Sequence, residues 1–422
     1  MIQTLQLTPG VVLRHCPDHR FKTALLSIQF LRPMCREEAA SNALLSAVLL
    51  RGTRNFPNIR ALSARQDGLY GASVSPLLRR IGDIQTLGLF AGFLEDRFAL
   101  PGDEILAPVI DLVRQILLEP ALRDGMFDPE FVESEKRNQI ADIEAELNDK
   151  QTYASARMIR HLCAGDSYAL ELRGQVEDVQ AITPESLYRH YETVLRTSPV
   201  EIFYVGSADI QAVAKLLLPL TDVVAREPMA LPKQTRLNPI SEPAQLFERM
   251  EVNQCKLSMG FTTPISYSSP NFAAMQVLIA VYGAGMTSKL FLNVREKLSL
   301  CYYANAAYYP TKGIVTVSSG IDEEHYETAR AEILRQLALC AEGSISEEEL
   351  SAAKRALISG LRAIPDSPGA LERFYGTAYI SDSPRSLDQY IDAISAVTVS
   401  DAAQAAATIT LHSEFFLKGA AK

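Results

Sequence analysis

The feature that most constrains the fold of this 422-residue chain is a set of structural signals that recurs in its two halves. A helix start at Asp128-Pro129-Glu130-Phe131 has a counterpart at Ser346-Glu347-Glu348-Glu349, where a serine and a glutamate three residues later form a capping box. A second pair of helix starts follows, Thr183-Pro184-Glu185 and Thr398-Val399-Ser400-Asp401, and each half then reaches a short apolar strand. Because order and spacing agree, we infer an internal duplication rather than a chance recurrence of helix-start signals.

A proline-rich stretch separates the two halves. Between Val223 and Ala244 lie Pro228, Pro232, Pro239 and Pro243. Proline fixes φ and removes a backbone hydrogen-bond donor, so this stretch is predicted to be an extended linker. The chain is also too long for one hydrophobic core. We therefore expect an N-terminal domain over 1–222, a linker over 223–243 and a C-terminal domain over 244–422.

Both domains are predicted to be α+β. Strand-like apolar segments occur at 11–14, 23–31, 84–93 and 200–206 in the first half, and at 245–263, 313–321 and 414–419 in the second. The long helical segments are expected to pack on one side of these strands, so that each domain is a layered, mainly antiparallel sheet with helices.

Composition excludes several classes of partner and site. The chain has 41 basic and 50 acidic residues, and this balance argues against a nucleic-acid partner, which needs a basic face. The N-terminus lacks a signal-peptide pattern, and the longest apolar runs, such as 43–50, are too short to cross a bilayer. Six scattered cysteines without CxxC spacing indicate thiols in a reducing compartment. We expect a cytoplasmic protein without a membrane partner.

A long motif in the second half carries a family resemblance. It runs from Gly283-Ala284-Gly285-Met286-Thr287-Ser288 through Arg295-Glu296-Lys297 to Leu300-Cys301-Tyr302. This segment is similar to one in insulinase/pitrilysin-type metallopeptidases, the superfamily that includes mitochondrial processing peptidase. With the duplication, the linker and the length, the resemblance covers essentially the whole chain. It implies a LuxS/mitochondrial-processing-peptidase-like metallohydrolase fold.

That family is recognised by an inverted zinc motif, His-x-x-Glu-His, on a helix of its first domain. Histidines four residues apart share one helical face and supply two ligands, the glutamate between them acts as base, and a downstream glutamate is the third ligand. The resemblance places this helix at 40–53, with its register set by Gly52-Thr53 and by Gly68 and Gly71 further on. The two ligand positions then fall on Ala43 and Ala47, the base on Ser46, and the third ligand near Glu133.

These residues predict a degenerate metal site. Methyl groups cannot bind zinc, and one hydroxyl cannot replace a carboxylate base. We therefore expect a pseudoenzyme with no metal cofactor of its own and no peptidase activity alone. His15 and His19 are also four apart, but Pro17 lies between them, and we interpret this segment as a surface loop.

The resemblance also implies roles for residues of the second domain. In the family, the counterparts of Arg295 and Tyr302 reach the scissile carbonyl beside the zinc, where such donors stabilise an oxyanion. The loop with Gly283, Gly285, Met286 and Ser288 would line the peptide chamber. A purely structural use is the alternative: a helix C-cap and turn, a paired arginine and a tyrosine at a strand start. The Leu-x-Tyr spacing favours Tyr302 over Tyr303.

Several members of the family work as pairs, one chain with the zinc motif and one without. The sequence fits the second role, that of a zinc-less accessory subunit of a metalloendopeptidase with a peptide substrate. The expected partner is a zinc-bearing homologue, which would form a heterodimer with this chain, and the other possibility is a homodimer. It is similar to bacterial zinc-less chains associated with aminopentanol modification of elongation factor P. The alternatives are a structural or peptide-binding scaffold of the same fold, and a hydrolase with chemistry relocated to a cysteine.

Overall fold

The computed structural model describes residues 2–221, 226–240, 242–299 and 301–419, which fold into two compact units. Each unit is built from three separate stretches of chain. Unit 1 contains Met1–Ile143, Leu170–Lys233 and Pro365–Thr377, and unit 2 contains Glu144–Ala169, Gln234–Ile364 and Ala378–Lys422. A single division at the linker would assign two of these stretches differently. The structure counts Glu144–Ala169 with unit 2 and Pro365–Thr377 with unit 1.

Unit 1 is built on a six-stranded sheet in the order β1-β2-β8-β3-β5-β4. Neighbouring strands are antiparallel, except that β2 and β8 are parallel. The strands are β1 (Gln3–Thr8), β2 (Val11–Pro17), β3 (Thr23–Pro33), β4 (Ser73–Ile81), β5 (Ile84–Leu94) and β8 (Val200–Gly206), and β6 (Leu122–Arg123) and β7 (Met126–Phe127) form a separate hairpin.

The helices of unit 1 bury apolar faces against this sheet. They are α1 (Arg36–Leu49), α2 (Ile59–Asp67), α3 (Leu106–Leu118), α4 (Pro129–Ala145, whose end belongs to unit 2), α6 (Val176–Gln180), α7 (Pro184–Thr197) and α8 (Ile210–Thr221). Leu44 of α1, Val113 of α3 and Leu187 of α7 are fully buried together with Ile28 of β3 and Leu89 of β5. Burial of this apolar area is the main driving force for folding of the unit.

Unit 2 repeats the strand arrangement of unit 1. Its five-stranded sheet has the order β11-β12-β10-β13-β9, again antiparallel except for one parallel pair, β13 and β9. The strands are β9 (Ala244–Arg249), β10 (Cys255–Thr262), β11 (Cys301–Tyr309), β12 (Ile314–Ile321) and β13 (Thr410–Lys418). Each strand of unit 2 therefore has a topological counterpart in unit 1, with β1 as the additional strand. The α+β prediction is confirmed.

Two helices of unit 2, α11 (Glu347–Ala363) and α14 (Val399–Ala407), begin where the capping signals predict. The other helices of the unit are α5 (Lys150–Leu162), α9 (Phe272–Tyr282), α10 (Tyr326–Ala341) and α13 (Leu387–Ala396), with a π-helix, η4, at Leu290–Lys297. Ser346 and Thr398 both form capping boxes, as Thr183 does in unit 1. The paired helix starts seen in the sequence are therefore real N-termini in both units.

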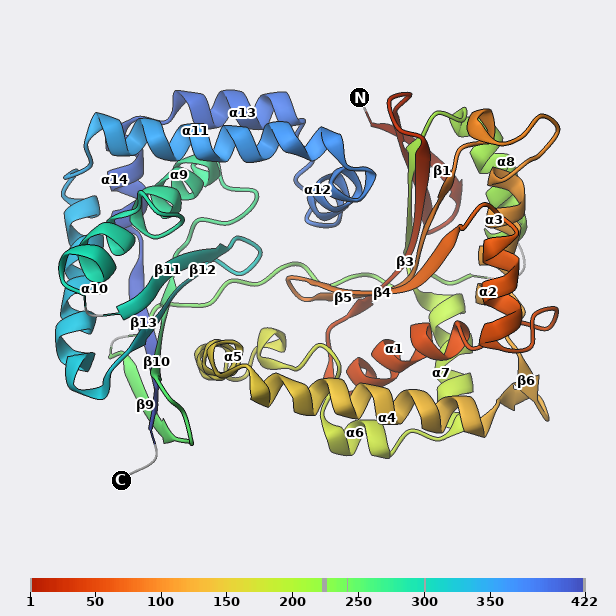
Figure 1. The fold of residues 1–422 in the computed structure, drawn as a ribbon, viewed down its shortest axis with the longest axis horizontal. Coiled ribbons are helices and arrows are strands. Elements are labelled where there is room, and N and C mark those ends of the chain that lie inside the picture. The colour runs from red at the N-terminus through yellow and green to blue at the C-terminus, as the bar shows by residue number, and fades with distance from the viewer. Residues whose placement is uncertain (1, 222–225, 241, 300, 420–422) are drawn as a thin grey trace. The chain divides into compact units, whose positions relative to one another are not determined.

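The second face of each sheet receives one helix from the opposite half of the chain, and Figure 1 shows these helices, α5 in yellow and α12 (Pro368–Ile380) in blue. Glu372 of α12 accepts hydrogen bonds from Ser27 and Gln29 of β3 and is paired with Arg79 of β4. Ser27 and Gln29 alternate with the core residues of β3, so α12 lies on the face opposite α1.

Helix α5 covers the corresponding face in unit 2 through apolar contacts. Met158 and Leu162 pack so closely on β10 that a Cβ at Gly260 would lie within 2.4 Å of each. Leu417 and Phe415 of β13 belong to the same cluster, whereas their neighbours Glu414 and Phe416 contact α10. Both sheets thus have helices on both faces rather than on one.

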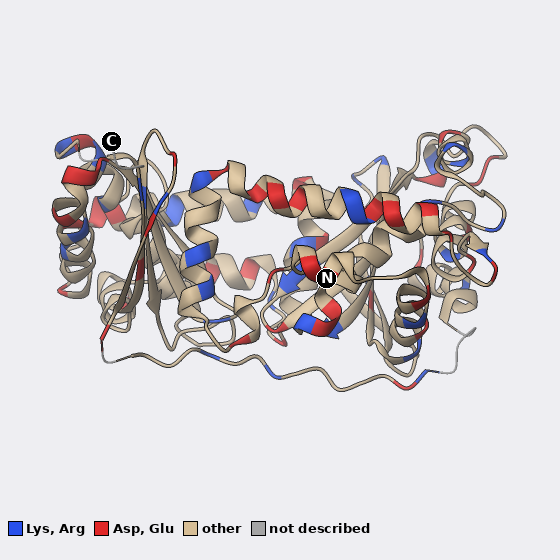
Figure 2. Ribbon diagram, turned by 90° about the horizontal axis from the view of Figure 1, so that it is seen from below, with Lys and Arg blue, Asp and Glu red and all other residues tan. Residues whose placement is uncertain are grey.

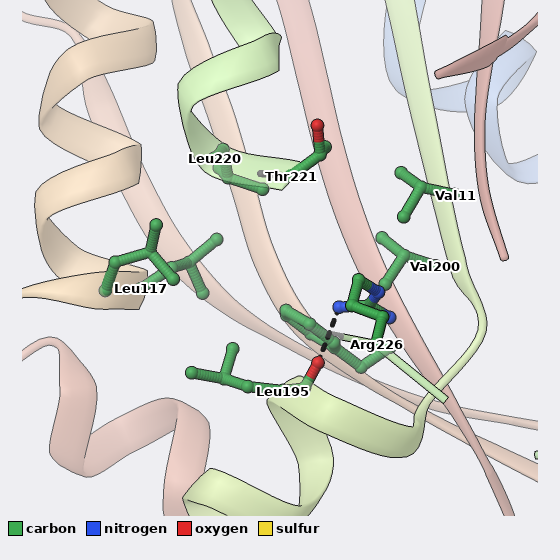
Figure 3. Close-up of a pocket in the computed structure, with 9 residues that line it drawn as sticks. Val11, Leu117, Leu195, Val200, Leu220, Thr221 and Arg226 are labelled. Atoms are coloured by element: carbon green, nitrogen blue, oxygen red, sulfur yellow. Dashed lines mark hydrogen bonds between the residues drawn. The ribbon is translucent and has the colours of Figure 1, made fainter. Parts of the chain in front are cut away.

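The described part of the linker is attached to both units by side chains. Arg226 donates hydrogen bonds to the carbonyls of Leu195 and Ser198 at the end of α7, beside a cavity of about 10 Å³ (Figure 3). In unit 2, the buried Lys312 binds Asp166 and Thr235. Residues 223–225 and 241 of the predicted linker lie outside the described residues.

Charges of both signs are interspersed along the helices (Figure 2). Within the described ranges, no helix has the length and apolar character needed to cross a bilayer.

Candidate functional site

Helix α1 in unit 1 carries the positions that the sequence assigned to the metal ligands. Ala43 and Ala47 lie one turn apart and line a pocket of about 350 Å³. Their methyl groups offer no donor atom to a metal. The remaining lining comes from α1, β4, α4 and the segment before α6: Ser46, Pro76, Leu78, Glu135, Asn138, Gln139, Asp142 and Arg173.

Ser46, at the predicted base position, has a structural role. Its side chain is buried, and its hydroxyl oxygen accepts a hydrogen bond of 3.1 Å from the backbone N–H of Gly88 in β5. Gly88 has φ of +153°, and a Cβ there would lie 1.9 Å from the carbonyl oxygen of Ile28, so only glycine fits. Ser46 therefore attaches α1 to the sheet and does not act as a base.

Glu135 lines the pocket and Glu133 does not, and Asp142 is a second carboxylate of the lining. Glu133 is 53% exposed and pairs with Lys136, whereas Glu135 is 14% exposed and lines the pocket. Residues two apart on an α-helix point about 200° apart, so only one of them can face α1. Glu135 accepts hydrogen bonds from Arg51, at 2.9 Å, and from Asn138, at 3.1 Å.

The residues of this pocket do not fit a zinc ion. Two ligand positions hold methyl groups, and the base position is a hydrogen-bonded hydroxyl. The two carboxylates of the lining, Glu135 and Asp142, are each paired with a guanidinium. Within the part of the chain that the structure describes, no group of three or more His, Cys, Asp or Glu side chains is placed to hold a metal. We derive no metal chemistry from this pocket.

A buried polar network next to Ala43 was not predicted from the sequence. Asn42 donates to Gln85 at 2.8 Å and accepts from His190 Nε2 at 2.7 Å. Burial lowers the pKa of His190, which favours its neutral form. Gln85 in turn donates to the carbonyls of Ala39 and Leu172. This network fixes α1 against β5 and α7.

The glycine loop of unit 2 follows α9 and has conformational requirements at two positions. A Cβ at Gly283 would lie 2.5 Å from that of Ala306, whose N–H donates to the Gly283 carbonyl. Gly285 has φ of +105°, in the region that favours glycine. Ser288 is buried and donates to the Gly285 carbonyl at 2.8 Å, so it holds the loop, while Met286 is 76% exposed.

Arg295 lies in the π-helix η4 that follows this loop. π-Helices are rare and occur frequently at functional sites. The Arg295 guanidinium is centred 4.6 Å from the ring of Phe291, and the side chain is 42% exposed. Its ion pair with the adjacent Glu296 is long, at 3.7 Å. The guanidinium is thus oriented by a ring but still accessible.

Tyr302 and Tyr303 at the start of β11 have opposite surroundings. Tyr302 is 73% exposed. Tyr303 lies against Lys256, whose ammonium is 5.6 Å from its ring centre, and against Gly320, and burial raises its pKa well above the usual value. Tyr302 is therefore the accessible phenol of the pair. Leu300 of the Leu-x-Tyr motif lies outside the described residues.

Of the histidine pair His15 and His19, the structure gives His15 a structural role. His15 is not in a surface loop: it lies in β2, and the Val11, Leu13, His15 alternation turns it inward, where its Nε2 is 3.1 Å from the Gly206 carbonyl. His19 is exposed.

The cysteines do not favour a relocated nucleophile. Burial raises the pKa of four thiols, those of Cys16, Cys35, Cys301 and Cys340, the last to about 12. A reactive cysteine needs the opposite shift, because the thiolate is the nucleophile.

Comparisons with known proteins agree with this geometry. The family model "Peptidase M16 inactive domain" matches residues 181–357. The chain is 29% identical over 410 residues to the probable inactive metalloprotease YmfF of Bacillus subtilis, covering 97% of this chain and 96% of that protein.

Two solved structures are similar over their full length. A conserved protein from Enterococcus faecalis V583 has a TM-score of 0.92 and 28% identity, covering 100% of this chain and 99% of that one. A peptidase M16 inactive domain from Pseudomonas fluorescens has a TM-score of 0.82 and 17% identity, covering 100% and 98%. The second supports the fold alone. Together, these matches confirm the resemblance to the insulinase/pitrilysin, or M16, peptidases.

Proposed function

We propose that this chain, an inactive M16-type peptidase homologue, acts as the zinc-less subunit of a peptide-processing metalloendopeptidase. Its partner in this proposal is a homologue with an intact His-x-x-Glu-His motif, which supplies the zinc. Unit 2 of this chain supplies Arg295 and Tyr302 to the carbonyl of the bound peptide. The assembly is a heterodimer located in the cytoplasm, and the shared topology of units 1 and 2 reflects an internal duplication.

The exposure of Tyr302 is the observation that carries the proposal. A tyrosine that served only to start β11 would pack its ring, as the neighbouring Tyr303 does. Tyr302 instead leaves its hydroxyl open, on the strand that follows the π-helix with Arg295. An accessible phenol and an accessible guanidinium are the donors that a developing oxyanion needs.

The loop before the π-helix is suited to contact with a peptide. Met286 is exposed, and its flexible thioether side chain adapts to varied apolar partners. Gly285 adds no side chain, so the backbone can approach a substrate closely. In this proposal Gly283 and Ser288 hold the shape of the loop, and Met286 and Gly285 form the contact.

Co-expression with a zinc-bearing homologue from the same organism tests the assembly. We expect the two chains to co-elute in size-exclusion chromatography at micromolar concentration, with one zinc per pair. The mixture should cleave a peptide library that neither chain cleaves alone. If each chain elutes as a monomer and the partner cleaves equally well by itself, the subunit proposal is refuted, and a scaffold or peptide-binding protein becomes the better interpretation.

A further inference from the structure

Strand β9 forms one edge of the unit 2 sheet. Among the described strands it pairs with β13 alone, whereas its topological counterpart in unit 1, β2, is paired on both sides, with β8 and with β1. The outer edge of β9 thus lacks the antiparallel strand that β1 provides in unit 1. An uncovered edge presents backbone N–H and C=O groups that can pair with another strand.

The residues of β9 do little to protect this edge. The strand contains no proline and no lysine, and its six residues pair with β13 without a bulge, although these are the devices that commonly blunt an edge. Its two charged side chains are bound within unit 2. Glu248 accepts a hydrogen bond from Tyr153 at 2.7 Å, and Arg249 donates to the Gly419 carbonyl at 2.8 Å. The edge is therefore open to a further strand.

Phe247, in the middle of β9, is 51% exposed although it belongs to an aromatic cluster. Its ring meets those of Tyr326 and Phe416 edge-on, with centroids 5.9 and 6.5 Å apart, and Lys418 Nζ lies 4.8 Å from its centre. The ring is thus held in place by its own unit, while about half of the side chain stays accessible. An aromatic ring on an added strand would bury that surface.

We propose that β9 pairs with β9 of a second copy of this chain, antiparallel and across a two-fold axis at Phe247. In this register Phe247 meets the same residue of the second copy. Gln245 lies opposite Arg249 of the second copy on the same face of the sheet, so that an amide oxygen faces a guanidinium. The two five-stranded sheets join into one continuous sheet.

The neighbouring registers fit less well. An axis at Glu248 would place that carboxylate opposite its own copy, and like charges directly opposite each other are destabilising. An axis at Leu246 would bring Pro243, which has no N–H to donate, opposite Arg249 of the second copy. A second copy is also the occupant that ends the assembly at two chains, because a two-fold contact is closed.

The proposed contact is at the opposite edge of the sheet from β11, the strand that contains Tyr302. It therefore does not rest on the role proposed for Tyr302, and its test needs no zinc-bearing partner.

Sedimentation velocity of the purified chain at increasing concentration tests the assembly. Pairing over six residues is a small interface, so we expect a reversible monomer–dimer equilibrium. Phe247→Lys should shift it to the monomer, because two ammonium groups would meet at the axis. Leu218→Lys, at an exposed apolar position of α8, is the matched control and should leave the equilibrium unchanged. A chain that is monomeric at every concentration, or a dimer that persists in Phe247→Lys, would overturn the proposal.

Cysteine cross-linking tests the register and does not require a variant that disrupts the dimer. Phe247→Cys places two thiols opposite each other, with a Cα separation of about 4.5–5.5 Å that a disulfide can bridge. Gln245→Cys, on the same face, is the control, since its thiol would lie about 14 Å from its own copy. With diamide as oxidant, we expect a covalent dimer for Phe247→Cys, and for Gln245→Cys only the background of the unmodified chain. Equal cross-linking of the two variants, or none in either, would refute the two-fold pairing.

Discussion

The pocket over α1 and the segment from Gly283 to Tyr302 differ in how their polar groups are used. At and beside the α1 pocket, three polar side chains are bound to other groups of unit 1. Ser46 holds the backbone of β5, Asn42 links Gln85 to His190, and Glu135 is paired with Arg51. Each of these groups is engaged in an internal hydrogen bond or ion pair.

The segment in unit 2 shows the opposite arrangement. Tyr302 is mostly exposed, and the ion pair of Arg295 with its neighbour Glu296 is long. Ser299, between them, has a φ of +51°, an unusual conformation for a residue with a side chain. The pocket that the resemblance assigned to a metal is structural in this chain, whereas Arg295 and Tyr302 are accessible, in a segment with a strained residue of the kind that functional sites often contain.

The largest effect is expected from Arg295→Met in the complex with the zinc-bearing partner. Methionine keeps an apolar stem over Phe291 but removes every donor. Loss of one oxyanion donor costs about a hundredfold or more in turnover. The melting temperature of the chain should change little, because an exposed cation–ring contact contributes about 0.5–1 kcal/mol. Lys297→Met, in the same π-helix, is the control and should keep full turnover; equal turnover in both variants would place Arg295 outside the chemistry.

A smaller effect, on stability alone, is expected from Asn42→Leu. Leucine fills a similar volume but leaves the Gln85 oxygen and the His190 N–H buried without their partner. Each unsatisfied group costs about 1–3 kcal/mol, and urea denaturation should show a loss of roughly 2 kcal/mol or more. Asn138→Leu, at an exposed position of the α1 pocket, should reduce the free energy of unfolding by much less. If the folded Asn42→Leu chain lowers turnover in the complex, the two regions are not as separate as the comparison states.

The smallest effect concerns pH. Burial lowers the pKa of His190, so below about pH 6.5 the unfolded chain takes up a proton that the folded chain still excludes. Stability is therefore lost as the pH falls from about 6.5 towards the lower pKa of the folded state, by at most about 1.4 kcal/mol per pH unit for this proton.

His190→Gln separates this contribution from that of the other acid-sensitive groups, because glutamine can still donate to Asn42. Urea denaturation at about pH 7.5 and pH 5.5 should show a smaller loss for the variant than for the unmodified chain. Identical losses would mean that His190 is not held neutral by the fold.

Local patterns in the sequence were sufficient to predict many elements. The strand Val200–Gly206 and the capped starts of α7, α11 and α14 are where the apolar runs and capping signals indicate. These features depend on residues close together in the chain, and local sequence determines them.

The features that depend on distant partners were not predicted. Periodicity does not indicate on which of the two sheets α5 and α12 pack. Each of these helices packs on the sheet formed by the opposite half of the chain. The choice of Glu135 over Glu133 requires the rotation of α4 relative to α1, and the pairing with Arg51 follows from it. The π-helix at Leu290–Lys297 has a composition that suits an ordinary helix, so only its backbone reveals it.

The central claim is that unit 2 supplies the accessible phenol of Tyr302 to a zinc site on another chain. The two adjacent tyrosines, Tyr302 and Tyr303, allow a direct test. We would measure kcat/KM of the reconstituted complex with Tyr302→Phe and with Tyr303→Phe, both of which keep the ring. The account predicts a loss of about a hundredfold or more for Tyr302→Phe and little change for Tyr303→Phe, with intact assembly in both. Cleavage by the Tyr302→Phe complex at the unmodified rate would contradict the claim.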